Sequence, residues 1–120
     1  MIESSQDPGV ISQAVALGVP GVAGVARLTP GAGVEAATYF AGGKTVGVVV
    51  RKDQLRVHIV VSQLPIAEVS ERVREAAQRV LGALGAERPV EVVVEDLEVE
   101  QLPPHSIALP PAKTRPLRMR

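Results

Sequence analysis

One stretch of the chain predicts a long amphipathic helix, and this helix constrains what the remaining residues can form. Between Pro65 and Gly85, apolar side chains recur every three or four residues, a spacing that places them on one stripe of a helix. Proline is tolerated in a first helical turn, and glycine suits the left-handed position that ends a helix. The predicted stripe must be buried against other elements of the chain. Its members are Ile66, Val69, Val73, Ala76, Val80 and Leu84.

Three valine-rich segments predict the sheet that covers this helix. Thr45–Arg51 and Gln54–Val61 are separated by two residues and predict an antiparallel hairpin. Pro89–Val99 predicts a last strand, with a change of phase near Asp96 that indicates either a bulge or the end of the strand. This strand should run parallel to Gln54–Val61, because a long helix connects the two.

The N-terminal third predicts smaller elements. Asp7 and Pro8 have the residue types of a helix cap and a first helical turn, so a short helix should run from there to about Gly18. Val22–Leu28 predicts a strand, and Thr29–Gly33 predicts a loop. The segment Val34–Phe40 is compatible with either a short strand or one helical turn.

Together these elements predict an α+β fold in the order α-β-β-β-α-β. The sheet should be mainly antiparallel, with three to four strands and both helices packed on one face. We expect an N-terminal tail over residues 1–7, the folded domain over 8–100, and a basic C-terminal tail over 101–120. Five prolines in that tail exclude regular secondary structure.

Composition argues against most kinds of chemistry. The chain has no cysteine, which excludes disulfides, thiol catalysis and cysteine-ligated metals. Its two aromatic residues, Tyr39 and Phe40, are too few for the stacking platforms of single-strand nucleic-acid binders. No acid–base or nucleophile set is visible, so we expect a protein that is not an enzyme and that needs no cofactor or metal. His58 reads as a surface histidine, and His105 lies in the tail.

Three glycine-containing motifs resemble binding loops only in part. Residues 42–45 (GGKT) match the end of a phosphate-binding loop, but a strand is expected to follow where that loop needs a helix. Residues 31–36 lack the long helix that a dinucleotide fingerprint requires. Residues 21–24 (GVAG) match the clamp of KH domains in letters, but they join a helix to a strand instead of two helices.

Two regions are candidates for interactions. On the sheet face opposite the long helix, Gly47, Val49, Val60 and Val93 would form a modest apolar patch. This patch serves self-association, or the Val34–Phe40 segment covers it. The tail contains the second candidate, a basic group that either contacts an anionic lipid surface or only aids solubility. Its members are Lys113, Arg115, Arg118 and Arg120.

The chain resembles the alkaline-shock protein family, also called the envelope-stress response family. The resemblance covers roughly residues 8–100 and is carried most specifically by VPGVAG at 19–24 and PIAEV at 65–69. IS-x-x-VAL at 11–17, GGKTVGVVV at 42–50, LRVHIVV at 55–61 and VEVVVEDLEV at 90–99 extend it. The chain departs from the family at residues 62–64, where a glycine is common, and in its tail.

The resemblance implies a non-enzymatic cytoplasmic protein that supports cell-envelope homeostasis in bacteria. Such a protein associates with the inner side of the membrane through a membrane-anchored protein partner, and homo-oligomers are compatible with this role. No apolar run approaches membrane-spanning length, and acidic residues stand where a secretory signal would be basic. The alternative prediction is a KH-like nucleic-acid-binding module, suggested by the order of elements and the basic tail.

Overall fold

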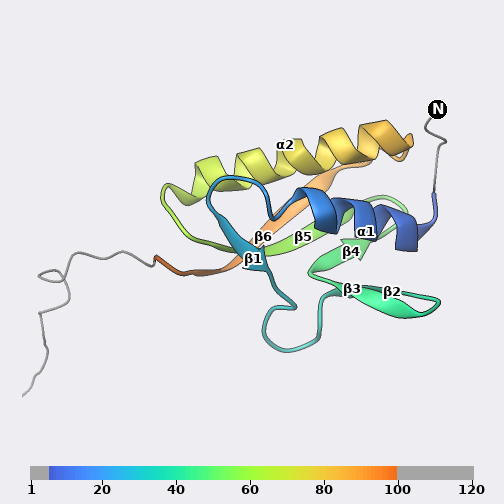
Figure 1. The fold of residues 1–120 in the computed structure, drawn as a ribbon, viewed down its shortest axis with the longest axis horizontal. Helices are drawn as coiled ribbons and strands as arrows, with labels where there is room; N and C mark the ends of the chain where they lie inside the picture. The colour runs from blue at the N-terminus through green and yellow to red at the C-terminus, as the bar shows by residue number, and fades with distance from the viewer. Residues whose placement is uncertain (1–5, 100–120) are drawn as a thin grey trace, which may run out of the picture.

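The computed structural model describes residues 6–99 and shows two helices packed on one face of a sheet (Figure 1). The predicted α+β class and the order of helix, strands, helix and final strand are confirmed. The helices are α1 (Pro8–Gly18) and α2 (Ile66–Leu84). The strands are β1 (Val25–Leu28), β2 (Ala37–Phe40), β3 (Gly43–Val46), β4 (Val48–Val50), β5 (Leu55–Val61) and β6 (Val90–Leu97).

Both helices have the ends that their sequences predict. The Asp7 carboxylate accepts a hydrogen bond of 2.8 Å from the Gly9 N–H, and Pro8 is the first helical residue of α1. Helix α2 ends at Gly85, which has the left-handed φ of 68°. The buried stripe of α2 is rotated slightly from the predicted one, because Ala77 and Leu81 are fully buried whereas Val80 and Leu84 are only half-buried.

Strand β5 is the centre of the main sheet. The parallel strand β6 lies along one edge of β5, as predicted. Strands β4 and β1 share the other edge, where β4 pairs with the first half of β5 and β1 with the second half. Between Ile59 and Val60 of β5 the register with β6 shifts by one residue, which leaves Glu95 unpaired in the ladder. Of the two alternatives expected near Asp96, the structure therefore shows the bulge, since β6 continues to Leu97.

The predicted strand Thr45–Arg51 is divided in two at Gly47. Residues before it form β3, which pairs with β2 in a separate two-stranded sheet, and residues after it form β4. Gly47 has a φ of 86°, a left-handed conformation that redirects the chain from one sheet to the other. Its N–H donates to the Ala36 carbonyl and its carbonyl accepts from the His58 N–H, both at 2.8 Å. The segment Val34–Phe40, left open above, contains strand β2.

Thr38 joins the two sheets. Its buried hydroxyl donates to the Val48 carbonyl at 2.7 Å and accepts from the Val50 N–H at 3.0 Å. A second buried hydroxyl pair, Ser12 on α1 and Thr45 on β3, lies 2.9 Å apart and attaches the small sheet to the first helix. These contacts hold the β2–β3 hairpin below α1 in the view of Figure 1.

The core lies between the two helices and one face of the main sheet. Aliphatic side chains from α1, β5 and α2 fill it, and the alternate residues of β5 predicted to face the long helix are all fully buried. Burial of a valine, leucine or isoleucine side chain contributes about 1.5–3 kcal/mol, so this cluster is the main source of stability. Its largest members are Ile11, Val15, Val19, Val48, Leu55, Val57, Ile59, Val61, Val69, Val73 and Leu81.

Candidate interaction surface

The apolar patch predicted on the far face of the sheet is mostly not exposed. Val60 retains 2% of its accessible surface, and Gly47 is also buried. Val49 and Val93 are half-buried. The predicted exposure of Val60 is therefore wrong, although an interaction through Val49 and Val93 remains a prediction.

Polar pairs that cross between strands explain why this face is not open. Arg27 pairs with Val60 in the β1–β5 ladder, and both of its terminal nitrogens bind the Glu98 carboxylate beyond β6, at 2.6 and 2.9 Å. Since Val60 lies on β5 between these partners, the ion pair spans the central strand at this residue. Further along the same face, Arg56 Nε lies 3.1 Å from Glu91 Oε1. The face of β5 and β6 is thus largely polar.

The loop after β1 covers another part of this face. Its Thr29 N–H donates to the His58 carbonyl at 3.0 Å, which fixes the loop to β5. Val34 and Ala36 then line a shallow pocket of about 230 Å³ together with Val49 and His58. The covering by the Val34–Phe40 segment, one of the two alternatives considered above, therefore accounts for part of the burial.

His58 is buried, which contradicts the prediction of a surface histidine. Its Nδ1 lies 2.7 Å from Glu95 Oε2, and since a carboxylate can only accept, Nδ1 carries the proton and donates it. Its Nε2 is buried without a hydrogen-bond partner among the described residues. The sequence could not show this pair, because Glu95 reaches His58 only through the parallel β5–β6 pairing and its bulge.

Two exposed ion pairs shift the pKa values of their members. The hydrogen bond from Arg27 lowers the pKa of Glu98 below its ordinary value, and the same bond raises the pKa of Arg27. The hydrogen bond from Lys44 Nζ, 2.8 Å away, and then that from Tyr39 lower the pKa of Glu35. These groups are open to solvent and form structural pairs, and none of them lies in a closed cleft with a nucleophile.

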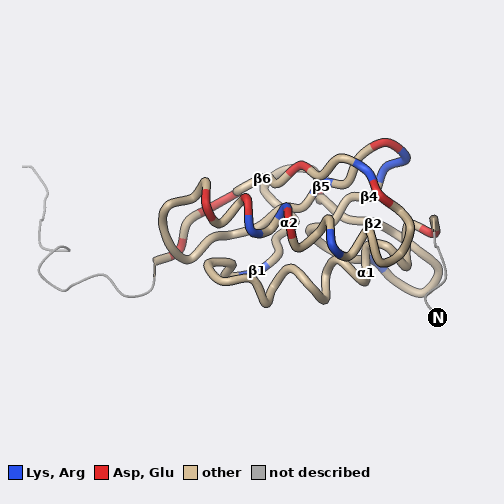
Figure 2. Tube along the Cα trace, turned by 90° about the horizontal axis from the view of Figure 1, so that it is seen from above, with Lys and Arg blue, Asp and Glu red and all other residues tan. Residues whose placement is uncertain are grey.

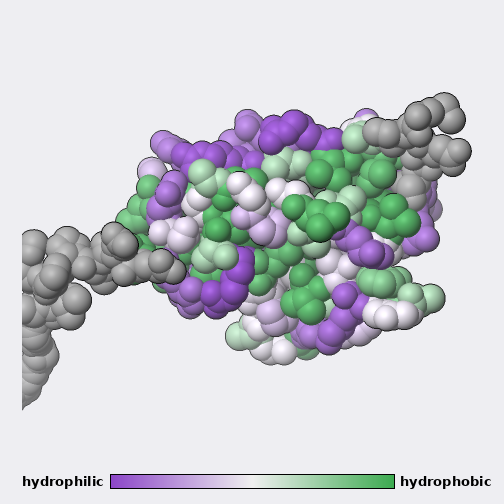
Figure 3. All heavy atoms as spheres, in the orientation of Figure 1, coloured by the Kyte–Doolittle hydropathy of each residue, from purple (hydrophilic) through white to green (hydrophobic). Residues whose placement is uncertain are grey.

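The outer side of α1 is an exposed surface without charged side chains. Leu17 is 86% exposed and Val10 is 43% exposed, and with the half-buried Ala14 between them they form an i, i+4, i+7 stripe that faces solvent. Residues 8–26 contain no charged side chain at all. Figure 3 shows hydrophobic residues gathered over α1, and in Figure 2 the trace of α1 has no charged position, unlike α2.

The sequence contained a signal for this surface. A helix that is apolar on all sides is usually buried on all sides, and α1 is apolar on its inner side, through Ile11 and Val15, and also on its outer side. Spacing alone places Val10, Ala14 and Leu17 on one stripe of the helix, but it does not show which side of α1 stays exposed. The cross-strand pairs that cover the far-face patch depend on tertiary pairing, so the sequence pattern does not show that this patch is closed.

The motif-like glycine segments occupy turns. Gly42 lies in the turn between β2 and β3, and Gly43 begins β3, so these residues lead into a strand and not into the helix of a phosphate-binding loop. Residues 21–24 connect α1 to β1, and Arg72 of α2 donates to the Ala23 carbonyl there at 3.1 Å. Neither segment has the structural context of the binding loop that it imitates.

Residues 6–99 contain neither a metal-binding cluster nor a membrane-spanning helix. No group of three or more histidine and acidic side chains in this range could hold a metal ion. Neither helix is both long and apolar enough to cross a membrane. Four candidate residues, Lys113, Arg115, Arg118 and Arg120, lie outside the described residues.

Comparison with known proteins identifies no similar protein or structure. No protein-family model, curated protein or solved structure matches this chain. The alkaline-shock resemblance therefore stays a prediction from the sequence segments quoted above.

Proposed function

We propose that this chain is a non-catalytic interaction domain of the alkaline-shock, envelope-stress type. It acts in the cytoplasm through protein contacts, including a partner that connects it to the membrane. Two things support the proposal: the sequence resemblance and the exposed, uncharged outer stripe of α1. The stripe is the observation that carries it, because Val10 and Leu17 are left in water by the fold.

The size of the stripe indicates weak pairwise contacts. An 11-residue helix is about 16 Å long and about 10 Å wide, so its outer side offers roughly 150–200 Å². A stable interface buries about 800 Å² on each partner, so α1 must recruit neighbouring residues or act in several copies. Ala23 and Ala26, in the uncharged segment that follows α1, are exposed and extend the surface. We expect micromolar or weaker association.

A second copy of the chain is the occupant that the charge distribution favours. In a two-fold symmetric contact the same surface meets itself, so any charged residue near the axis faces its own like charge. Helix α2 carries Glu71, Glu75 and Arg79 on its exposed side, whereas α1 carries no charge. Self-contact through α1 therefore has no like-charge penalty.

Cross-linking through an introduced thiol tests this contact, because the natural chain has no cysteine. Leu17→Cys places one thiol on the stripe, and Val34→Cys places one at a 93% exposed position on the loop after β1. Under mild oxidation we expect the Leu17→Cys protein to form covalent dimers several times faster than the Val34→Cys protein. Equal rates at micromolar concentration would exclude α1 as the self-association surface.

The proposed attachment to the membrane through a partner has to be tested in cells. Capture of partners from extracts and membrane fractionation should be compared for the wild type, for Leu17→Glu and for a chain without residues 101–120. We expect Leu17→Glu to lower the membrane-associated fraction. If only removal of the tail lowers it, the tail and not α1 is the site of attachment.

The nucleic-acid alternative has its own test. A KH-like module should bind RNA or DNA with an affinity that falls steeply as salt rises. The structure offers no specific observation in its favour, because residues 21–24 do not join two helices.

A further inference from the structure

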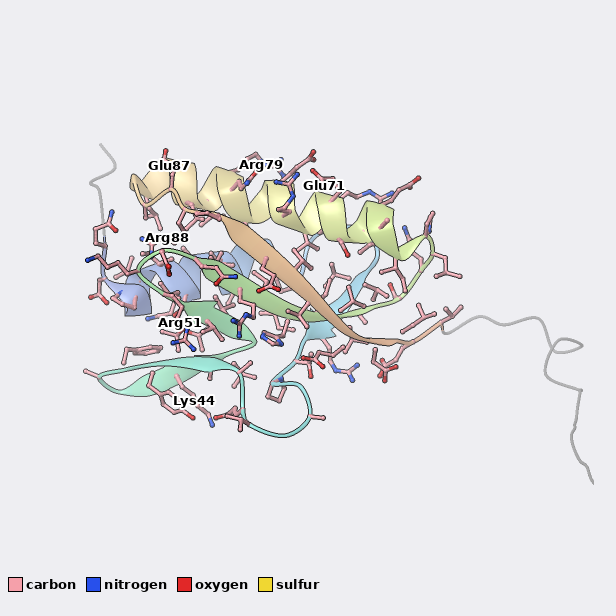
Figure 4. All side chains as sticks on the ribbon, turned by 180° about the vertical axis from the view of Figure 1, so that it is seen from behind. Lys44, Arg51, Glu71, Arg79, Glu87 and Arg88 are labelled. Atoms are coloured by element: carbon pink, nitrogen blue, oxygen red, sulfur yellow. The ribbon has the colours of Figure 1, made fainter. Side chains whose placement is uncertain are left out.

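A cluster of positive side chains lines a pocket at the end of the molecule where α1 begins. The pocket has a volume of about 390 Å³ and is lined by Gln6, Pro8, Val50, Arg51, Lys52 and Arg88. Three of these residues are cations, and no carboxylate lines it. Figure 4 shows Arg51 and Arg88 at this end, close to the turns that follow β4 and α2.

Arg88 is fixed in place by neutral acceptors. Its Nε donates to the Ala86 carbonyl at 2.9 Å, one terminal nitrogen donates to the Arg51 carbonyl at 2.5 Å, and the other donates to Gln6 Oε1 at 2.9 Å. A guanidinium has five N–H groups, so two remain for a ligand. None of the three acceptors carries a negative charge, and the positive charge of Arg88 is therefore not compensated by them.

The side chains of the other two cations have no hydrogen-bond or ion-pair partner among the described residues. The side chains of Arg51 and Lys52 make no hydrogen bond or ion pair within residues 6–99, in contrast to Arg56, which binds Glu91. Carboxylates lie near the pocket but are not part of its lining. Asp53 follows in the same turn, Asp7 stands between Gln6 and Pro8, Glu87 shares a separate pocket with Arg88, and Glu35 shares another with Arg51. The Gly9 N–H at the start of α1 donates to the Asp7 carboxylate, so it does not serve as a donor to a ligand in this pocket.

The side chains that line the pocket indicate the chemical class of its ligand. Arginine and lysine are donors only, so the ligand must be rich in acceptors. The three cations form no ion pair among the described residues, and together they provide more positive charge than one carboxylate needs. They match a phosphomonoester, which carries a charge of about −1.5 to −2 at neutral pH. Pro8 and Val50 add an apolar wall, and the lining has no aromatic ring on which a base would stack. We propose that this pocket binds the phosphate group of a small phosphomonoester.

This proposal is independent of the interaction role of α1, because Leu17 and Val10 do not line the pocket. It can be tested by NMR on the ¹⁵N-labelled full chain, titrated with inorganic phosphate and, at equal ionic strength, with acetate. We expect phosphate to shift the amide signals of residues 50–52 and 86–89, and acetate to shift them much less. Equal shifts with both anions would overturn the proposal.

Matched variants assign the binding to these side chains. Lys52→Gln and Arg51→Gln should each weaken phosphate binding at least fivefold, since a hydrogen bond to a charged group is typically worth more than that factor. Arg79→Gln removes a cation from the exposed side of α2 and should leave the affinity unchanged. Unchanged binding in both pocket variants, or an equal loss in Arg79→Gln, would contradict the assignment.

Two further probes separate the sources of such a phosphate. Glycerol 3-phosphate represents a free metabolite, and vesicles of phosphatidylcholine with phosphatidic acid represent a lipid headgroup. Binding of glycerol 3-phosphate, lost in Lys52→Gln, supports the small-molecule site that we propose. Binding to the vesicles alone would replace it with a headgroup site, and binding to neither probe would overturn it.

Discussion

Replacement of Gly47 by alanine should destabilise the fold more than the same replacement at Gly42. Both glycines have a left-handed φ, 86° at Gly47 and 94° at Gly42. This conformation costs a residue with a side chain about 1–2 kcal/mol. The two sites differ in their surroundings, which makes Gly42→Ala a matched control for the backbone term.

The surroundings of Gly47 supply the additional cost. A Cβ atom at this position would lie 2.9 Å from Leu28 Cβ and 3.0 Å from the Thr29 nitrogen, whereas one at Gly42 would have no heavy atom within 4 Å. Thr29 cannot move freely, because its N–H is bonded to the His58 carbonyl. Overpacking of this kind costs about 1–3 kcal/mol. We therefore expect about 2–5 kcal/mol for Gly47→Ala and about 1–2 kcal/mol for Gly42→Ala.

Urea unfolding followed by far-ultraviolet circular dichroism measures the difference. With a slope of about 1–3 kcal/mol per molar urea for a domain of this size, the additional cost of about 1–3 kcal/mol should place the midpoint of Gly47→Ala about 0.3–3 M below that of Gly42→Ala. Equal midpoints would show that Gly47 is not closely packed against the loop after β1. In that case the division of residues 45–51 between two sheets would need another cause.

Three further predictions follow from individual contacts. Thr38→Val keeps the shape of the side chain but removes both hydrogen bonds to β4, and urea unfolding should show a loss of about 1–3 kcal/mol. Glu95→Ala leaves both ring nitrogens of His58 unpaired, so it should cost about 1–3 kcal/mol by the same assay, and less when combined with His58→Leu. Arg27→Gln should return the pKa of Glu98 to its ordinary value in a carboxyl NMR titration. Because that pKa is lowered in the folded state, the pair stabilises the fold above the ordinary pKa and loses this effect as pH falls through the lowered value; Arg27→Gln should abolish that dependence.

The sequence pattern over a few residues was sufficient to predict the helices and strands that bury one side. The period of α2, the cap at Asp7 and the alternation in β5 each reflect near neighbours in sequence, and the structure has all three. The parallel course of β6 also followed, because a helical connection of this kind leaves little choice. These features rest on rules that act over a few residues or one crossover.

The errors have a common cause in tertiary pairing. Val46 and Val50 share the alternation of a single strand, so the sequence did not reveal that Gly47 would send the two halves to different sheets. Likewise Val60 reads as an exposed residue until Arg27 and Glu98 are known to meet across it. The signal for α1 was present, but an uncharged helix is visible as a surface only after its buried side is known.

Sedimentation velocity over a range of concentrations tests the central claim most directly. The full chain should show a mass-averaged sedimentation coefficient that rises with concentration in the micromolar range or above. Leu17→Glu should remain monomeric with an unchanged circular dichroism spectrum, and Val34→Glu should associate like the wild type. A wild-type chain that stays monomeric throughout, or a Leu17→Glu chain that associates normally, would contradict the role assigned to α1.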